Sequence, residues 1–125
     1  MNSKEPKSVS NFFKPALTGM AAAFRSQFNM KIHGIMAVLV IISAFYFKLS
    51  PVEWCIILFC IGSVFVAELL NTSLEVTVDI ASPHIQEKAG LAKDVAAAAV
   101  LFASIMSAII GLIIFIPKIL QQFFS

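Results

Sequence analysis

Four polar side chains interrupt an apolar stretch in the middle of the chain, and their types and spacing could do chemistry. The stretch from Ala67 to Asp79 reads AELLNTSLEVTVD, and its polar side chains of interest are Glu68, Asn71, Glu75 and Asp79. On a helix that turns by about 100° per residue, these four fall within an arc of about 80°. Acidic groups at the end of a membrane helix are costly unless they meet a cation, a pocket or water. These residues, called the acidic stripe below, therefore predict a functional site.

The acidic stripe offers oxygen ligands of the kind that Mg²⁺ prefers. Mg²⁺ commonly takes one or two protein carboxylates together with substrate phosphates. Lys93 and Asp94 follow one short connection later, and a lysine supplies a point charge for phosphate. A glutamate at headgroup depth could accept the proton of a lipid hydroxyl. The combination suggests phosphoryl transfer from MgATP to a lipid alcohol. An ion pathway, or interhelical hydrogen bonds without turnover, remains open at this point.

Other common catalytic motifs do not occur in the sequence. It holds no Gly-rich phosphate loop, no HExxH and no CxxC. The two histidines, His33 and His84, are isolated in the sequence, and we interpret them as interfacial or loop residues rather than ligands.

The composition predicts an all-α integral membrane protein. Of 125 residues, 59% are hydrophobic and 13% are charged, whereas soluble domains are about 45–50% apolar and about 25% charged. Three spans of about 20 residues and a short head use up this length. Any chemistry is therefore expected at the bilayer surface, with the membrane as a partner and no nucleic acid.

The elements that position the acidic stripe are predicted to form one membrane domain over residues 12–118. A polar, flexible N-terminus precedes it and a short tail follows it. Apolar residues recur at helical spacing in the first segment, and interspersed polar residues make it an amphipathic surface helix. The predicted parts are the N-terminus at 1–11, the surface helix at about 12–31, transmembrane helices at about 32–48, 51–80 and 91–117, and the tail at 119–125.

The start of the second span fixes the depth of the acidic stripe. Ser50-Pro51-Val52-Glu53 is a compact start signature, with a cap, a proline in the first turn and a capping-box glutamate. Counting about 20 residues of about 1.5 Å each from Val52 places the membrane boundary near Asn71. Glu68 is therefore expected at the depth of lipid headgroups, and Asp79 about 10 Å beyond the boundary in water.

Lysine and arginine placement predicts the orientation. With three spans, the N-terminal segment and the second connection share one side, and they hold seven of the nine cationic residues. These are Lys4, Lys7, Lys14, Arg25, Lys31, Lys88 and Lys93. Because cytoplasmic segments carry the excess of positive charge, the N-terminus and the acidic stripe are expected to face the cytoplasm, where ATP is found.

The third span carries a pattern of small residues. Ala99, Ala103, Ser107 and Gly111 recur at every fourth position, and such a pattern lets helix backbones approach closely. The span is therefore expected to pack against other helices and to end at Pro117-Lys118.

Two linked motifs resemble the prokaryotic diacylglycerol kinase family, which includes the undecaprenol kinases. Glu68-Leu-Leu-Asn71-Thr-Ser-Leu-Glu75-Val-Thr-Val-Asp79 is similar to its E-x-x-N-[ST]-[AS]-[IL]-E-x-x-x-D signature. Ala92-Lys93-Asp94, before an alanine-rich run, is similar to its second motif, A-K-D-x-[AG]-[AS]-A-[AG]-V. The spacing of fifteen residues from Asp79 to Asp94 also agrees with the family. Similarity extends over about residues 12–118.

The resemblance implies a homotrimer in the inner membrane of a bacterium, with cytoplasmic active sites shared between neighbouring protomers. Glu68 would be the general base on the hydroxyl of the lipid alcohol. Glu75 would bind the Mg²⁺ that bridges the ATP phosphates. The residues that would hold nucleotide or orient these groups are Asn71, Asp79, Lys93 and Asp94.

One position departs from the family pattern. The family usually has a second metal-binding glutamate about six residues before the position of His33, and here that position is Gln27. An amide oxygen can still bind Mg²⁺ but brings no charge, so weaker metal binding and slower turnover are expected. The alternative is a catalytically weakened or non-enzymatic membrane protein that keeps the fold. The Asn29–His33 element and the long, mostly apolar first segment resemble the undecaprenol kinase branch of the family, and this resemblance implies undecaprenol rather than diacylglycerol as the acceptor.

Overall fold

The computed structural model describes residues 8–84 and 86–125, and the regular structure in these ranges is entirely helical. The predicted all-α class is therefore confirmed. Four helices follow one another along the chain: α1 Val9–Ser26, α2 Phe28–Tyr46, α3 Pro51–Ala81 and α4 Glu87–Phe124.

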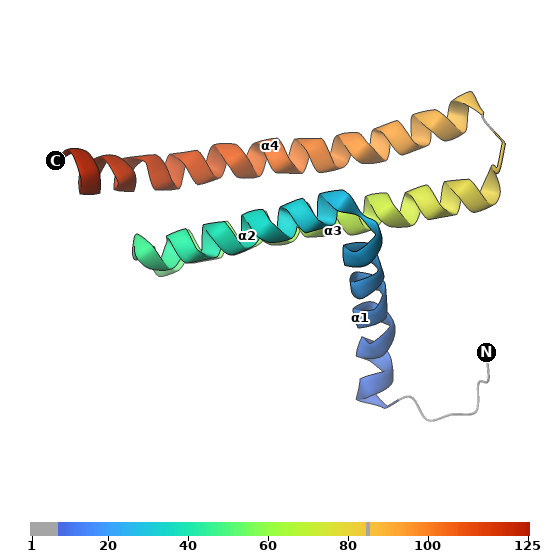
Figure 1. The fold of residues 1–125 in the computed structure, drawn as a ribbon, viewed down its shortest axis with the longest axis horizontal. Helices are drawn as coiled ribbons and strands as arrows, with labels where there is room; N and C mark the ends of the chain where they lie inside the picture. The colour runs from blue at the N-terminus through green and yellow to red at the C-terminus, as the bar shows by residue number, and fades with distance from the viewer. Residues whose placement is uncertain (1–7, 85) are drawn as a thin grey trace.

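Three of the helices lie along a common direction, and the first does not. In Figure 1, α3 and α4 run antiparallel side by side, α2 lies against α3, and α1 leaves the start of α2 at a steep angle. The last turns of α3 and the first turns of α4 extend beyond the α1–α2 corner (Figure 1). The acidic stripe therefore lies at the end of the bundle that carries the α3–α4 connection.

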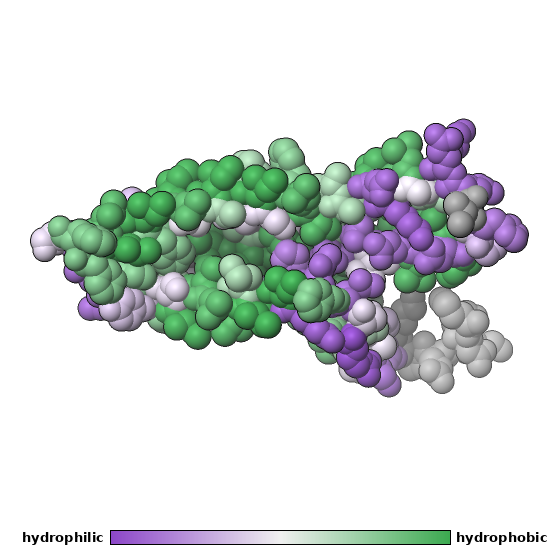
Figure 2. Space-filling model, turned by 45° about the horizontal axis from the view of Figure 1, so that its top comes forward, coloured by the Kyte–Doolittle hydropathy of each residue, from purple (hydrophilic) through white to green (hydrophobic). Residues whose placement is uncertain are grey.

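Three helices are long and apolar enough to cross a membrane, namely α2, α3 and α4. Their outward-facing side chains are largely exposed and apolar, as suits contact with lipid. Figure 2 shows hydrophobic residues over most of the length of this face, with hydrophilic residues gathered towards the end that carries the α3–α4 connection. The described residues therefore hold three candidate spans, the number predicted from the sequence.

The corner between α1 and α2 lies at Gln27, whose extended backbone (φ −109°, ψ 118°) separates the two helices. The predicted surface helix continued to Lys31, but α2 begins at Phe28. Helical spacing persists through this stretch, so the sequence does not reveal a break of one residue. Packing holds the corner: the rings of Phe24 and Phe65 lie 5.8 Å apart, and a Cβ on Gly34 would lie 3.1 Å from Phe24 Cε1.

The start of α3 has the predicted capping box. Ser50 Oγ accepts a hydrogen bond from the Glu53 backbone N–H at 3.2 Å, and the Ser50 backbone N–H donates to Glu53 Oε1 at 2.9 Å. Glu53 also forms an ion pair with Lys118 of α4, with 3.0 Å between Oε1 and Nζ. The cap therefore links the start of α3 to the last turns of α4.

The end of α4 differs from the prediction. The helix was expected to end at Pro117-Lys118, but it continues through Pro117 to Phe124 and includes most of the expected tail. A proline inside a helix removes one hydrogen bond and costs about 3 kcal/mol. Two contacts hold these last turns, the Lys118–Glu53 ion pair and the 2.8 Å hydrogen bond from Gln122 Nε2 to Tyr46 Oη.

The start of α1 also differs from the prediction of a flexible segment over residues 1–11. Val9 to Asn11 form its first turn, whereas residues 1–7 of the predicted flexible segment lie outside the described residues.

Substitution of the α3 cap tests its contribution to stability. Ser50→Ala is expected to lower the free energy of unfolding by about 1 kcal/mol, because Glu53 N–H loses its acceptor. Thermal unfolding in detergent micelles measures the change. Ser43→Ala is the matched control, since the Ser43 hydroxyl donates only to Leu39 O within its own helix. Equal loss in the two variants would contradict a specific capping contribution.

Candidate functional site

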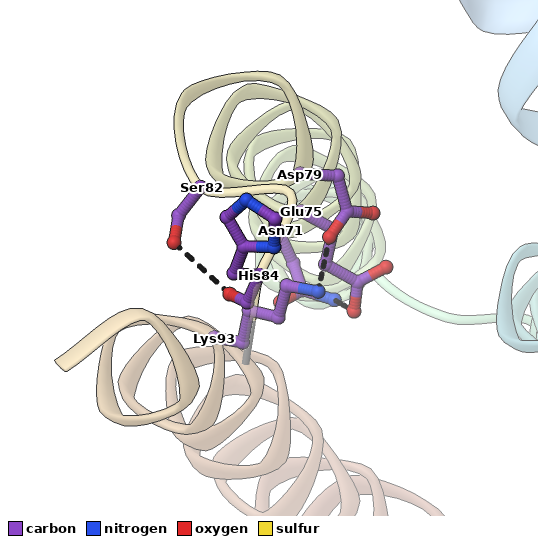
Figure 3. Close-up of polar contacts among 6 residues, drawn as sticks. All are labelled: Asn71, Glu75, Asp79, Ser82, His84 and Lys93. Carbon is purple, nitrogen blue, oxygen red and sulfur yellow. Dashed lines mark hydrogen bonds and ion pairs between the residues drawn. The ribbon is translucent and has the colours of Figure 1, made fainter. Parts of the chain in front are cut away.

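The acidic stripe runs from a buried to an exposed end of α3. Glu68 is 0% exposed and Asn71 is 7% exposed, whereas the Asp79 side chain is 65% exposed. Figure 3 shows Asn71, Glu75 and Asp79 along one side of the helix, towards Lys93. The exposed fraction therefore rises along the stripe from Glu68 to Asp79.

The buried end of the stripe is the Glu68 carboxyl group. Among the described residues, neither Glu68 Oε1 nor Glu68 Oε2 has a hydrogen-bond partner. His33 of α2 places Nε2 3.9 Å from Glu68 Oε2. Our interpretation of His33 as an isolated residue missed this approach, because the two residues are far apart in the sequence. No local pattern points from His33 to Glu68, because the rotation of α2 against α3 decides which side chains meet.

Asn71 and Glu75 form the middle of the stripe. Asn71 Nδ2 donates to Glu75 Oε1 at 3.5 Å, a long hydrogen bond between residues one turn apart. Asn71 Oδ1 is buried and has no partner within the described part of the chain. The amide therefore orients one Glu75 oxygen and leaves its own oxygen available.

The exposed end of the stripe joins α3 to α4. Lys93 Nζ donates to Asp79 Oδ1 in an ion pair across the two helices (Figure 3). The pair borders a polar hollow of about 220 Å³, which the α3–α4 connection lines with Ser82 and His84. Ser82 Oγ donates to His84 O at 3.2 Å and so shapes this connection. The partly exposed ammonium group of Lys93 is a point charge of the kind that binds phosphate.

The other two predicted site residues lie at the edges of this arrangement. Asp94 is exposed on the first turns of α4, next to Lys93. Gln27 is half-buried at the α1–α2 corner. Within residues 8–84 and 86–125, no hydrogen bond joins Gln27 to Glu75, and no group of three or more His, Cys, Asp or Glu residues could hold a metal ion. The protein donors therefore suit Mg²⁺ only together with phosphate oxygens of a ligand.

An apolar groove lies beside the stripe between α3 and α4. Its volume is about 670 Å³, and its lining runs from Leu58 to Leu74 on α3 and includes Ala96 and Ala99 on α4. Asn71 also lines this groove and is its polar member near the stripe. The small residues of α4 leave space here, whereas farther along the helix Ser107 Oγ donates to Cys60 O at 3.3 Å.

Comparison with known proteins adds independent findings. The family model described as "Prokaryotic diacylglycerol kinase" matches residues 14–115. The chain is 42% identical over 123 residues to the undecaprenol kinase of Bacillus subtilis, which covers 95% of this chain and 100% of that protein. It is 37% identical over 110 residues to the diacylglycerol kinase of Synechocystis sp., which covers 87% of this chain.

The two diacylglycerol kinases differ more from this chain than the Bacillus subtilis protein does, one in length and one in sequence. The match spans 63% of the Synechocystis protein, less than two thirds of its length. The diacylglycerol kinase of Escherichia coli is 28% identical over 91 residues, which are 73% of this chain and 75% of that protein.

Replacement of the buried carboxyl group tests whether Glu68 is held at a cost to stability. Glu68→Met keeps the side-chain length and removes two unpartnered buried oxygens, so we expect the free energy of unfolding to rise by about 1 kcal/mol or more. Thermal unfolding in micelles measures the shift, with Glu75→Met as the control at a half-buried, hydrogen-bonded position. A lower midpoint for Glu68→Met would mean that the carboxyl group has a stabilising partner.

Proposed function

The chain belongs to the prokaryotic diacylglycerol kinase family, and on this basis we propose that it transfers the γ-phosphoryl group of MgATP to the hydroxyl of a membrane lipid alcohol. One observation carries the proposal. The buried Glu68 carboxyl group, which has no hydrogen-bond partner among the described residues, lies on the same helix face as Asp79, which pairs with Lys93 in water-accessible surroundings. A base at lipid depth and a cation at nucleotide depth therefore belong to one site.

Glu68 acts as the general base. Its carboxylate takes the proton of the lipid hydroxyl, and the hydroxyl oxygen forms a bond to the γ-phosphorus. The bond from the γ-phosphorus to the β,γ-bridging oxygen breaks, and ADP leaves with that electron pair. Burial of Glu68 keeps bulk water away from the proton acceptor, which favours the lipid hydroxyl as the nucleophile.

The remaining stripe residues position the nucleotide. Lys93 carries the positive charge for phosphate oxygens, and Asp79 holds its ammonium group at the α3–α4 edge. Asn71 orients Glu75, and Asp94 lies on the α4 side of the same end. Glu75, with Gln27, would hold Mg²⁺, which when bound neutralises charge on the phosphates.

We infer a homotrimer with shared sites from two features of the single chain. The α3–α4 groove is apolar and open, and the buried Oδ1 of Asn71 at its lining has no hydrogen-bond partner in the part of the chain that the structure describes. Within the described residues of one chain, no hydrogen bond joins Gln27 to the stripe, so a neighbouring protomer would complete the metal site. The placement of lysine and arginine residues supports an inner-membrane protein whose site faces the cytoplasm.

The acceptor is proposed to be undecaprenol. The identity to the Bacillus subtilis undecaprenol kinase is 42% and covers 95% of this chain, against 28% over 73% for the diacylglycerol kinase of Escherichia coli. A weakened activity is the second candidate, because an uncharged amide at Gln27 takes the place where the family usually has a carboxylate.

Radiolabel transfer from ATP in mixed micelles tests the proposed reaction. Undecaprenol and diacylglycerol are supplied in parallel, and labelled undecaprenyl phosphate is expected to form faster than labelled diacylglycerol phosphate. Glu68→Gln should lower the rate by about 100-fold or more, since the amide cannot accept the proton. Glu87→Gln, the same change on an exposed residue of α4, is the control. Wild-type rates in Glu68→Gln, or no transfer to either lipid, would contradict the proposal.

Substitution at the α1–α2 corner tests the proposed role of Gln27. Gln27→Glu adds a charged ligand and is expected to make the free energy of Mg²⁺ binding more favourable by about 1 kcal/mol. The Mg²⁺ concentration that gives the half-maximal rate should therefore fall about fivefold. Magnesium titrations of the transfer rate measure it. Gln121→Glu, at the opposite end of the bundle, is the matched control. An unchanged magnesium requirement in Gln27→Glu would remove Gln27 from the metal site.

A further inference from the structure

Glu68 faces a specific side chain from another helix. His33 of α2 brings Nε2 to 3.9 Å from Glu68 Oε2, and the two side chains are 20% and 1% exposed. Neither Glu68 oxygen has a hydrogen-bond partner in the described ranges. His33 therefore places a ring nitrogen beside a buried carboxyl group, and its own side chain stays partly exposed.

The α1–α2 corner fixes the position of His33. Met30, one turn earlier on α2, is completely buried. Gly34, the next residue, lies so close to the Phe24 ring that an added Cβ would be 3.1 Å from Phe24 Cε1. Phe24 in turn packs on Phe65, one turn before Glu68 on α3. These contacts set the rotation of α2 against α3, and the rotation decides which α2 side chain approaches Glu68.

We propose that His33 is a positioning residue for Glu68 in the phosphoryl transfer. The His33 Nε2–H directs Glu68 Oε2 towards α2 and leaves Oε1 to take the proton of the lipid hydroxyl. A gap of 3.9 Å exceeds a direct hydrogen bond, and one bridging water or a small side-chain rotation closes it. Catalytic hydrogen bonds are often long without substrate and tighten in the complex. This inference rests on the proposed function of Glu68.

A positioning role makes a distinct kinetic prediction. His33→Leu removes the donor and is expected to lower kcat for lipid phosphorylation by at least about tenfold. The KM for MgATP should stay within about twofold, because the nucleotide residues lie further along α3 and on α4. His33→Gln restores an N–H donor and should recover a measurable part of kcat. Lys31→Leu, on an exposed position of the same helix, controls for loss of a basic group near the corner.

A spectroscopic measurement tests the contact without turnover. In ¹⁵N-histidine-labelled protein in micelles, Glu68→Gln is expected to shift the His33 Nε2 resonance, while Glu87→Gln leaves it unchanged. This measurement separates the two proposals. If the wild-type protein phosphorylates neither lipid, the proposed function fails, and a shift in the Glu68→Gln variant still supports the His33–Glu68 contact.

Three results would overturn the role of His33. The first is a wild-type kcat in His33→Leu. The second is an equal loss of kcat in His33→Leu and His33→Gln together with a lower midpoint of thermal unfolding in both, which indicates a packing role. The third is a His33 Nε2 resonance that does not respond to Glu68→Gln.

Discussion

The burial of a carboxyl group on an apolar helix is the constraint on which the rest of this structure depends. Glu68 is completely buried and has no hydrogen-bond partner within the described residues. Such a group costs stability wherever the surroundings are apolar. Ionisable groups within membrane helices are rare, and those that occur cluster at functional sites. The packing of α2 against α3, with His33 beside Glu68, fixes the position of the Glu68 side chain.

The antiparallel pair of α3 and α4 forms the water-accessible end of the candidate site. Both helices extend beyond the α1–α2 corner (Figure 1), so Asp79 and Lys93 meet outside the level of Glu68. A lipid hydroxyl cannot leave the interface, and a nucleotide cannot enter the hydrocarbon. A helix that carries both kinds of residue on one face joins these two depths, with Asn71 and Glu75 between them.

Much of this organisation follows from the order of residues along one helix. The period of 3.6 residues places Glu68 and Asp79 on one face whatever surrounds them, and three long apolar runs in the described residues are candidates for membrane spans. Ser50 and Glu53 fix the start of α3 through a local cap, which needs no tertiary contact. Local periodicity and capping are properties of neighbouring residues, so the sequence alone determined the helical class, the start of α3 and the shared face of the acidic stripe.

Tertiary structure decided what depends on contacts between distant segments. The break at Gln27 depends on how Phe24 packs against Gly34 and Phe65, and no local signal marks it. The continuation of α4 through Pro117 depends on contacts of its last turns with α2 and α3, which the proline preference cannot reveal. The approach of His33 to Glu68 follows from the rotation of α2 against α3. Side-chain packing sets that rotation, and periodicity leaves it undetermined.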